Sequence, residues 1–357
     1  WGEKFVRTPM ADFLGAYDSL ISRGVSVNLY MFHGGTNFGF HAGANYTREI
    51  PIQPSITSYD YDAPLDEAGH PTPKYLAIRE VLARHSKKPL PPVPAAPLVI
   101  AIPAVTLAPV ATLFDFIDTT HQVKSKRPLS FEELGQSTGY VLYRHHADTA
   151  VYGMLEVPGL RDFGLVFVNG RRTAMLDRRT STFSTVVDVP KGGELAILVE
   201  NEGRINYGAE MVRNRKGIIS SVRLAGEELS GWRMVRLPFS KVPKLPAQNG
   251  TAVNGTAVTA VSRRDSTFNG VPTLYRGSFT LDSLGDTFLD LGAWGKGIVF
   301  VNGHNLGRYW EIGPQRTLYL PAPWLKKGAN DLVVFEQLND SVPGTVQGLT
   351  AAVLDSL

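Results

Sequence analysis

The chain contains no cysteine among its 357 residues, which excludes disulfide bonds and metal sites built on thiolates. Its charge is nearly balanced, with 36 Lys and Arg residues against 33 Asp and Glu residues. The basic residues are scattered, so the positive surface typical of nucleic-acid-binding proteins is not expected. No apolar run is long enough to span a membrane, and the eight histidines lack metal-ligand spacing. We therefore expect no cofactor, metal, nucleic acid or membrane partner.

Apolar residues make up 43% of the chain, which is enough to fill a sizeable core. The composition favours a secreted or periplasmic type of globular protein, although it assigns no compartment. Trp1 is expected to lie inside a domain, so this end of the chain carries no information about a leader segment.

Residues 25–32 alternate between an apolar face and a polar or aromatic face, and this period of two predicts a strand over residues 26–32. The apolar face consists of Val25, Val27, Leu29 and Met31, and the other face of Ser26, Asn28, Tyr30 and Phe32. In a parallel barrel, Tyr30 would point inward near the active-site mouth. The alternative is an ordinary half-buried strand with an interior tyrosine.

Two helices are predicted on either side of this strand. The first begins after Thr8-Pro9 and ends at Gly24, and the second begins at Thr72-Pro73. Their apolar stripes are Phe13, Leu14, Tyr17, Leu20 and Ile21 in the first, and Tyr75, Ile78 and Leu82 in the second. The order helix, strand, long loop, helix is typical of the end of an alternating β/α pattern.

The loop over residues 33–70 is longer than most structureless connections, and loops of this length are usually functional. Aromatic side chains are frequent in it: Phe38, Phe40, Tyr46, Tyr59 and Tyr61. Aromatic rings stack on the C–H faces of sugars, while amides, hydroxyls and carboxylates bind sugar hydroxyls. The alternative is a surface loop held together by its own aromatic residues.

Four separated motifs, in residues 27–39, 58–65, 198–208 and 301–310, resemble those of the β-galactosidases of glycoside hydrolase family 35. The first resembles the last strand of that family's catalytic barrel, and the second its SYDYDAPL loop. A barrel of this kind needs about 250 residues. The resemblance therefore implies that residues 1–88 are the C-terminal end of an incomplete TIM barrel, whose N-terminal half would be a missing partner.

The resemblance also implies roles for individual residues. Tyr30 and Tyr61 match tyrosines that line the galactose subsite, and Tyr59 matches a neighbouring tyrosine. Both catalytic glutamates of the family would lie upstream of Trp1, and Glu3 is not one of them. The whole enzyme would hydrolyse terminal β-galactosides with retention of configuration. We therefore expect no catalytic residue in this chain and no activity from the chain alone.

Asp60 and Asp62 are the carboxylates nearest to these tyrosines in the sequence. Residues i and i+2 of an extended chain lie about 6.5–7 Å apart on one face. Glycosidases instead place two carboxyl groups around the scissile bond. We expect both aspartates to fix the loop through Asx-type hydrogen bonds.

An internal repeat organises the remainder of the chain. The sequence VFVNG at residues 166–170 recurs at 299–303, LYR at 142–144 recurs at 274–276, and ILVE at 197–200 parallels VVFE at 333–336. The Asn-Gly pairs predict type I′ hairpins. The fold class is thus a barrel tail followed by two all-β, jelly-roll sandwiches, which the resemblance describes as galactose-binding-domain-like.

The predicted boundaries place the first sandwich at residues 126–242 and the second at residues 265–357. A Pro- and Ala-rich connector over 89–125 precedes them, and a polar linker over 243–264 separates them. This linker contains the glycosylation-like triplets at Asn249 and Asn254.

Two polar and aromatic clusters remain open to interpretation. One consists of Asn201, Arg204, Asn206 and Tyr207, and the other of His304, Asn305, Arg308, Tyr309 and Trp310. Each could form a carbohydrate subsite or shape the barrel mouth, but interdomain packing uses the same residue types and is favoured.

Two functions are consistent with the sequence. The first is the C-terminal portion of a retaining β-galactosidase that supplies part of the galactose subsite. The alternative is a non-catalytic carbohydrate-binding or scaffold chain. A binding module has no reason to retain a subsite strand, a tyrosine-rich loop and two capped helices, which favours the first.

Overall fold

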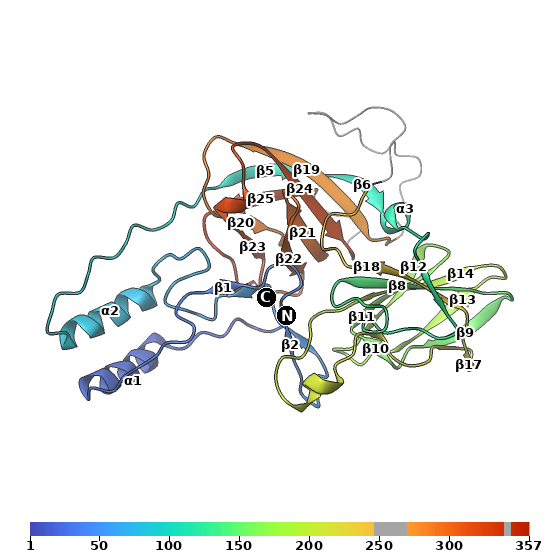
Figure 1. Cartoon of the computed structure of the whole chain (residues 1–357), viewed down its shortest axis with the longest axis horizontal. Helices are drawn as coiled ribbons and strands as arrows, with labels where there is room; N and C mark the ends of the chain where they lie inside the picture. Colours follow the sequence, from blue (N-terminus) through green and yellow to red (C-terminus); the bar gives the residue numbers. More distant parts are fainter. Residues whose placement is uncertain (246–269, 339–343, 357) are drawn as a thin grey trace.

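The computed structural model describes residues 1–245, 270–338 and 344–356. Two helices, α1 (Met10–Ser22) and α2 (Pro73–His85), lie side by side and extend away from two β-rich bodies (Figure 1). Four short strands connect the helices to these bodies: β1 (Gly35–Thr36), β2 (Ala44–Asn45), β3 (Gln53–Pro54) and β4 (Ser58–Tyr59). β1 pairs with β4 and β2 with β3, both antiparallel. No helix in the described part of the chain is long and apolar enough to cross a membrane.

Both predicted helices are confirmed, with the expected start of α2. Thr72 is the N-cap of α2, where its hydroxyl accepts a hydrogen bond from the Tyr75 amide, and Pro73 occupies the first turn. After α1, Gly24 adopts a φ of +72° and its amide donates to the Ile21 carbonyl. The apolar stripes of the two helices pack on each other around Tyr17, Ile78 and Val81.

The predicted strand over residues 26–32 is wrong in this structure. Residues 25–29 belong to no ladder: the Val25 amide donates to the Leu20 carbonyl at the start of the segment, and beyond its end the amides of Gly34 and Leu65 donate to the carbonyls of Leu65 and Phe32. A strand exists only beside a partner, and within the described residues no strand lies beside this segment. The alternation of side chains is present, but the backbone hydrogen bonds that define a strand are not.

The first sandwich contains a six-stranded antiparallel sheet in the order β12-β11-β14-β8-β18-β7. Its strands are β7 (Val123–Ser125), β8 (Tyr140–His146), β11 (Phe163–Val168), β12 (Arg171–Asp177), β14 (Glu194–Glu200) and β18 (Trp232–Leu237). A four-stranded sheet, β13-β9-β16-β17, covers one face. It consists of β9 (Val151–Glu156), β13 (Ser184–Val189), β16 (Arg223–Leu224) and β17 (Glu227–Glu228), while β10 (Leu160–Arg161) pairs separately with β15 (Gly217–Ile218).

The second sandwich repeats this plan with sheets in the orders β22-β21-β24-β19-β6 and β23-β20-β25-β5. The first sheet consists of β6 (Ala108–Thr112), β19 (Thr273–Leu281), β21 (Lys296–Val301), β22 (His304–Trp310) and β24 (Gly328–Glu336). The second consists of β5 (Ile102–Thr106), β20 (Thr287–Asp290), β23 (Thr317–Leu320) and β25 (Thr345–Leu349). The remaining elements are α3 (Leu113–Phe116) and the 3₁₀ helices η1 (Ala209–Arg213) and η2 (Ala322–Trp324).

Residues 102–125 are not the connector that the sequence predicts. β5 and β6 are the edge strands of the two sheets of the second sandwich, and β7 belongs to the first sandwich. Prolines at 103 and 109 are compatible with these strands because an edge strand can forgo a ladder hydrogen bond. The first sandwich is consequently inserted between β6 and β19 of the second. Asn249 and Asn254 lie outside the described residues.

The internal repeat corresponds to the same hairpin and the same neighbours in each sandwich. Both Asn-Gly turns have positive φ at the two central residues, 49° and 77° at Asn169-Gly170 and 49° and 85° at Asn302-Gly303, as type I′ requires. β14 and β8 follow β11 in one sheet as β24 and β19 follow β21 in the other.

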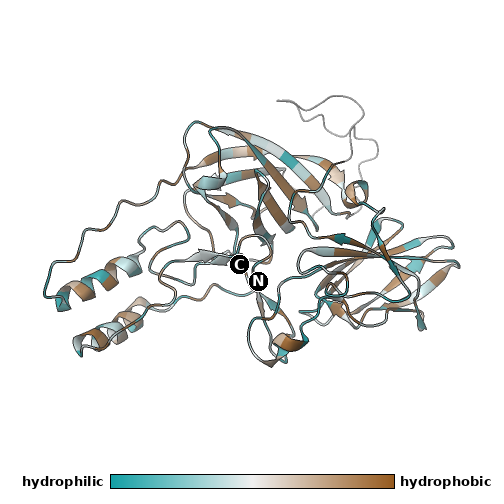
Figure 2. Cartoon of the chain, in the orientation of Figure 1, coloured by the Kyte–Doolittle hydropathy of each residue, from teal (hydrophilic) through white to brown (hydrophobic). Residues whose placement is uncertain are grey.

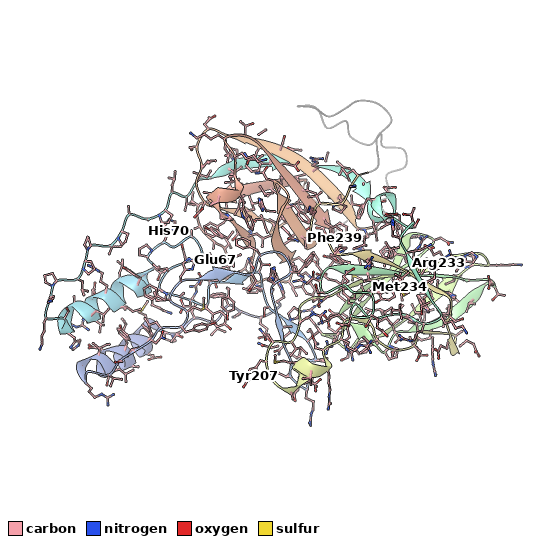
Figure 3. The ribbon with its side chains drawn as sticks, in the orientation of Figure 1. Glu67, His70, Tyr207, Arg233, Met234 and Phe239 are labelled. Atoms are coloured by element: carbon pink, nitrogen blue, oxygen red, sulfur yellow. The ribbon has the colours of Figure 1, made fainter. Side chains whose placement is uncertain are left out.

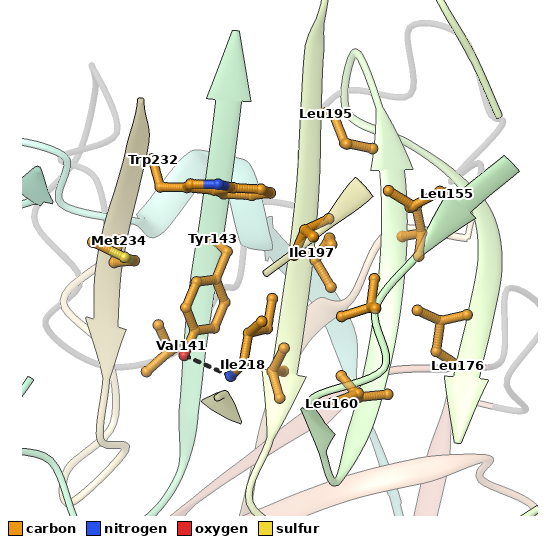
Figure 4. Packing of buried hydrophobic residues seen from close by; sticks show 14 of the residues in the cluster. Val141, Tyr143, Leu155, Leu160, Leu176, Leu195, Ile197, Ile218, Trp232 and Met234 are labelled. Carbon is orange, nitrogen blue, oxygen red and sulfur yellow. Dashed lines mark hydrogen bonds between the residues drawn. The ribbon is translucent and has the colours of Figure 1, made fainter. Parts of the chain in front are cut away.

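Three apolar clusters form the β core. One fills the first sandwich around Trp232 and Tyr143, whose hydroxyl accepts a hydrogen bond from the Ile218 amide at 3.1 Å (Figure 4). A second fills the other sandwich. The third joins the two larger sheets, with Phe167 and Leu198 from one and Phe300 and Phe335 from the other. The central strands are therefore apolar on both faces, as the brown strands of Figure 2 show.

A group of buried charges crosses the same junction. The Lys296 ammonium lies 2.6 Å from Glu200 Oε2 and 3.1 Å from Glu202 Oε1, and it also sits 4.2 Å from the centre of the Trp310 ring. On the other side of Glu200, Arg308 donates from Nε to Oε1 at 3.0 Å. All four side chains are at most 4% exposed, and burial raises the pKa of Glu202 to about 7. Lys296 and Arg308 lie on β21 and β22 of the second sandwich, whereas Glu200 ends β14 of the first and Glu202 follows it. The charges therefore fix how the sandwiches meet.

Replacing Lys296 tests this junction. Lys296→Met should lower the free energy of unfolding by about 3–5 kcal/mol, because it leaves two buried carboxylates with too little positive charge. Chemical denaturation measures the change. Lys191→Met, at an exposed position, is the matched control and should alter stability by less than about 0.5 kcal/mol. Equal effects of the two substitutions would contradict a structural role for Lys296.

Candidate functional site

The structure brings together the three tyrosines selected from the sequence. Tyr59 lies on β4, and its ring centre is 4.6 Å from that of Tyr61. A hydrogen bond between the hydroxyls of Tyr59 and Tyr30, together with partial burial, raises the pKa of Tyr59 to about 12. Tyr30 is 82% exposed and Tyr61 65% exposed. We call these three residues the tyrosine cluster. Its members offer hydroxyls and ring faces to solvent, and their role in binding sugar stays a prediction.

The two aspartates beside the cluster shape its backbone. The Asp62 amide donates to Asp60 Oδ1 at 3.0 Å, and the Asp60 amide donates to Ser58 Oγ at 3.2 Å. This confirms the predicted Asx-type turn at Asp60. Tyr61 and Asp62 both have a φ of +54°, in the left-handed region that non-glycine residues rarely adopt. Such strain persists only where surrounding contacts hold it, and it is common at functional sites.

Asp62 is held by cations rather than presented as a free carboxylate. The Lys74 ammonium, on α2, bonds to its carboxylate and also to its carbonyl oxygen at 2.6 Å. Arg7 lies 3.5 Å from its other oxygen. Burial raises the pKa of Asp60. The predicted Asx-type hydrogen bond is wrong for Asp62, whose carboxylate accepts from the Thr8 amide and from Lys74 instead. Lys74 is a supporting residue that sequence reasoning did not identify.

The second sandwich supports the loop immediately before the cluster. Thr57 Oγ1 donates to the Arg308 carbonyl at 2.7 Å, and the Ser58 amide donates to Gln315 Oε1 at 2.9 Å. Further along, the Phe38 ring packs 4.5 Å from the Trp324 ring. Thr57, Ser58 and Gln315 are buried. These contacts join residues more than 250 positions apart, so no local pattern of residues could predict them.

The first sandwich supports the other end of the loop. The Ala44 amide donates to the Arg204 carbonyl at 2.8 Å, and the Asn206 amide donates to the Ala44 carbonyl at 3.1 Å. Gly203 lies so close that a Cβ built on it would meet the Gly43 carbonyl oxygen at 2.5 Å. Phe40 packs edge-on against Tyr140, at 6.1 Å, and under the Arg308 guanidinium. The loop is thus clamped between both sandwiches.

The two polar clusters left open by the sequence take part mainly in this packing. Arg308 and Trp310 are buried at the junction, Tyr309 is buried in the core of the second sandwich, and Arg204 pairs with Glu132 of the first sandwich at 2.7 Å. Tyr207 differs because it is 82% exposed. His304 is also exposed, although its ring stacks 4.6 Å from Trp324. Most of each cluster therefore contributes to domain contact, as the sequence favoured.

A groove of about 750 Å³ opens beside Asp62, lined by Arg7, Thr8, Lys74 and residues 351–356. No member of the tyrosine cluster lines it. Within residues 1–245, 270–338 and 344–356, no group of three or more His, Asp or Glu side chains could hold a metal ion.

Comparisons with known proteins divide the chain in the same way as its structure. A family model described as "Glycosyl hydrolases family 35" matches residues 1–85. Models described as "Beta-galactosidase, first all-beta domain" and "Beta-galactosidase, galactose-binding domain" match residues 128–238 and 272–330. The structure and these matches together establish a chain that is mostly β-sandwich, with few helices.

Curated relatives match along nearly the whole chain. A beta-galactosidase of Xanthomonas manihotis is 38% identical over 323 residues, covering 90% of this chain and 51% of the relative. The human "Beta-galactosidase-1-like protein 2" is 37% identical over 350 residues, covering 94% and 52%. "Beta-galactosidase 17" of Arabidopsis thaliana is 36% identical over 366 residues, covering 94% and 51%. The chain spans about half the length of these relatives.

The close approach at Gly203 provides a test of the clamped loop. Gly203→Ala should push residues 42–45 away from the first sandwich, because its Cβ would overlap the Gly43 backbone. Gly192→Ala is the control, since Gly192 also has positive φ but a Cβ there meets no atom within 4 Å. The control should cost about 1 kcal/mol of backbone strain, and Gly203→Ala at least about 2 kcal/mol more. Hydrogen exchange of residues 42–45 should rise in Gly203→Ala alone; the same exchange in both variants would contradict the contact.

Proposed function

The chain belongs to glycosyl hydrolase family 35, and on this premise we propose that it forms part of a retaining β-galactosidase. The substrate would be a glycoside with a terminal, non-reducing β-D-galactose residue. The observation that carries the proposal is the tyrosine cluster: three hydroxyls meet at an exposed edge of a loop that both sandwiches clamp. In this role Tyr30, Tyr59 and Tyr61 form part of the galactose subsite.

The chemistry of the cluster suits a sugar. The Tyr59 hydroxyl is hydrogen-bonded to Tyr30, which raises its pKa to about 12, and its oxygen can accept a hydrogen bond from a sugar hydroxyl. Tyr30 and Tyr61 expose both ring and hydroxyl, and such rings cover the C–H face of a pyranose. Because the loop is fixed before substrate arrives, little ordering is needed on binding.

The carboxylate pair that retaining hydrolysis needs is proposed to lie outside these 357 residues. Retaining enzymes place two carboxyl groups about 5–5.5 Å apart, one as nucleophile and one as acid and base. Asp62 is neutralised by Lys74, and Asp60 accepts the turn hydrogen bond. Neither is presented as a nucleophile, so the chain alone is proposed to be inactive.

We further propose that residues 1–88 are the end of a catalytic barrel and that the rest of the barrel is the chain's principal partner. No described strand pairs with the backbone groups of residues 26–29. A neighbouring barrel strand would satisfy these groups. The coverage of the curated relatives, about half of each, supports the same view. The expected secreted or periplasmic location stays a prediction.

The alternative is a non-catalytic carbohydrate-binding or scaffold chain. The match of residues 272–330 to a galactose-binding domain favours it. The clamped tyrosine loop argues against it, because a binding module that uses only its sandwiches has no need to order residues 33–70.

Tyr61 gives the most direct mutational test. In a protein that carries both this chain and the barrel, Tyr61→Phe should lower kcat/KM for a β-galactoside by about 10- to 100-fold, which corresponds to losing one or two hydrogen bonds to the sugar. Thermal stability should hardly change, since the side chain is 65% exposed. Tyr152→Phe, on β9 and 74% exposed, is the matched control. Unchanged kinetics in Tyr61→Phe would remove Tyr61 from the subsite.

A further inference from the structure

A buried carboxyl group is bonded to the β1–β4 ladder that carries Tyr59. Glu67 occupies a tight turn in which Asp66 Oδ1 accepts hydrogen bonds from the amides of Ala68 and His70, at 2.9 and 2.8 Å. Gly69 closes the turn with a φ of +83°. The turn directs Glu67 inward, so that it is 3% exposed and lies beside β1 (Figure 3). None of the functions discussed above accounts for a carboxyl group in this position.

Glu67 is connected to the tyrosine cluster through two strands. Thr36 Oγ1, on β1, donates to Glu67 Oε1 at 2.6 Å. Thr36 pairs with Ser58 and Gly35 with Tyr59 in the β1–β4 ladder. On its other side, Ser58 is fixed by Gln315. The carboxyl therefore holds one strand of a two-residue ladder whose other strand carries Tyr59.

We propose that Glu67 is a positioning residue for the galactose subsite: through Thr36 and the β1–β4 ladder it fixes Tyr59, against which Tyr30 and Tyr61 lie. This inference rests on the proposed function of the cluster. Glu67 touches no substrate in this account. It acts on the backbone that carries the tyrosines, and a ladder of two residue pairs is too short to be stable without such support.

The surroundings of Glu67 favour its neutral form. Burial raises its pKa to about 7, and the negative charges of Asp60 and Asp66 act in the same direction, while the Thr36 and Ser58 hydroxyls oppose the shift. From the second sandwich, Tyr319 faces the same region and donates to Asp286 at 2.9 Å. The nearest imidazole, His70, is bonded to Asp66 at 3.3 Å rather than to Glu67. No cation contacts Glu67 among the described residues.

Because of this environment, the stability of the β1–β4 ladder should depend on pH. An unfolded or opened segment would give Glu67 its ordinary pKa of 4.5, against about 7 in the closed structure. A raised pKa in the closed form stabilises that form fully below pH 4.5, and the stabilisation is lost as pH rises towards and through 7. Between pH 5 and pH 8 the opening equilibrium of the loop should therefore increase by about 10- to 100-fold.

Hydrogen exchange of the 357-residue chain measures this opening. Protection of residues 33–60, corrected for the intrinsic effect of pH, should fall between pH 5 and pH 8 in the unchanged chain. Glu67→Gln keeps an acceptor for Thr36 without a titrating group, so its protection should equal that of the unchanged chain at pH 5 and exceed it at pH 8. Glu67→Ala should lose protection at both values. Glu227→Gln, at an exposed position on β17, is the control and should follow the unchanged chain.

Two results would overturn the positioning role. One is the same change in protection with pH in Glu67→Gln and in the unchanged chain. The other is full protection of residues 33–60 in Glu67→Ala. Protection of β11 and β14 in the first sandwich should stay constant in all variants, which separates local opening from general unfolding.

Kinetics in the protein joined to its barrel then separate this inference from the proposed function. At pH 5, Glu67→Ala should raise the galactose inhibition constant about tenfold, and Glu67→Gln should leave it unchanged. If Tyr61→Phe impairs hydrolysis but Glu67→Ala does not weaken galactose binding, Glu67 is not a positioning residue, although the tyrosine cluster still forms part of the galactose subsite. If hydrogen exchange behaves as expected but no variant of the tyrosine cluster affects hydrolysis, the cluster is not part of the galactose subsite, and Glu67 only stabilises the loop.

Discussion

The contact between Glu200, Lys296 and Arg308 is the interaction on which the rest of the structure depends. One negative and two positive side chains are buried where the larger sheets of the two sandwiches meet. Burying charges is costly unless they are paired and hydrogen-bonded, so only one mutual orientation of the sandwiches satisfies them. The apolar side chains around them would tolerate several orientations. Specificity at this junction therefore comes from the charges, and most of the free energy comes from the apolar area buried with them.

The orientation of the sandwiches in turn determines where the tyrosine loop can lie. Arg308 pairs with Glu200 through its guanidinium and accepts a hydrogen bond from Thr57 through its carbonyl. One residue thus belongs to both the sandwich junction and the loop support. Gly203 brings the first sandwich against the backbone of the loop at Gly43. The sandwiches hold the loop that carries Tyr59 and Tyr61, and the chain crosses between them twice because the first sandwich is inserted between β6 and β19 of the second.

Local signals in the sequence predicted local structure well. A helix cap was predicted from Thr72, a helix end from Gly24 and two turns from the Asn-Gly pairs, because each of these residues has its own backbone preference. The repeated VFVNG segments predicted two sandwiches with equivalent hairpins. The predicted strand over residues 26–32 was wrong because backbone pairing in a sheet depends on a neighbouring strand rather than on the alternation of side chains. β5 and β6 were missed because prolines hide edge strands. Glu67 and Gln315 could not be found at all, since their contacts exist only after distant segments meet. The tyrosines themselves came from a family resemblance, and the structure adds that they share one site.

We propose that this chain supplies part of a sugar-binding site, while the catalytic carboxylates come from a barrel segment outside these 357 residues. Hydrolysis of a chromogenic β-galactoside tests this most directly, measured for the chain alone and for the chain fused behind the barrel portion of the Xanthomonas manihotis relative. The account predicts no hydrolysis by the chain alone and hydrolysis by the fusion, abolished when the nucleophilic glutamate of the barrel is replaced by glutamine. Hydrolysis by the chain alone would contradict the account, because a carboxylate pair within it would then have to be catalytic.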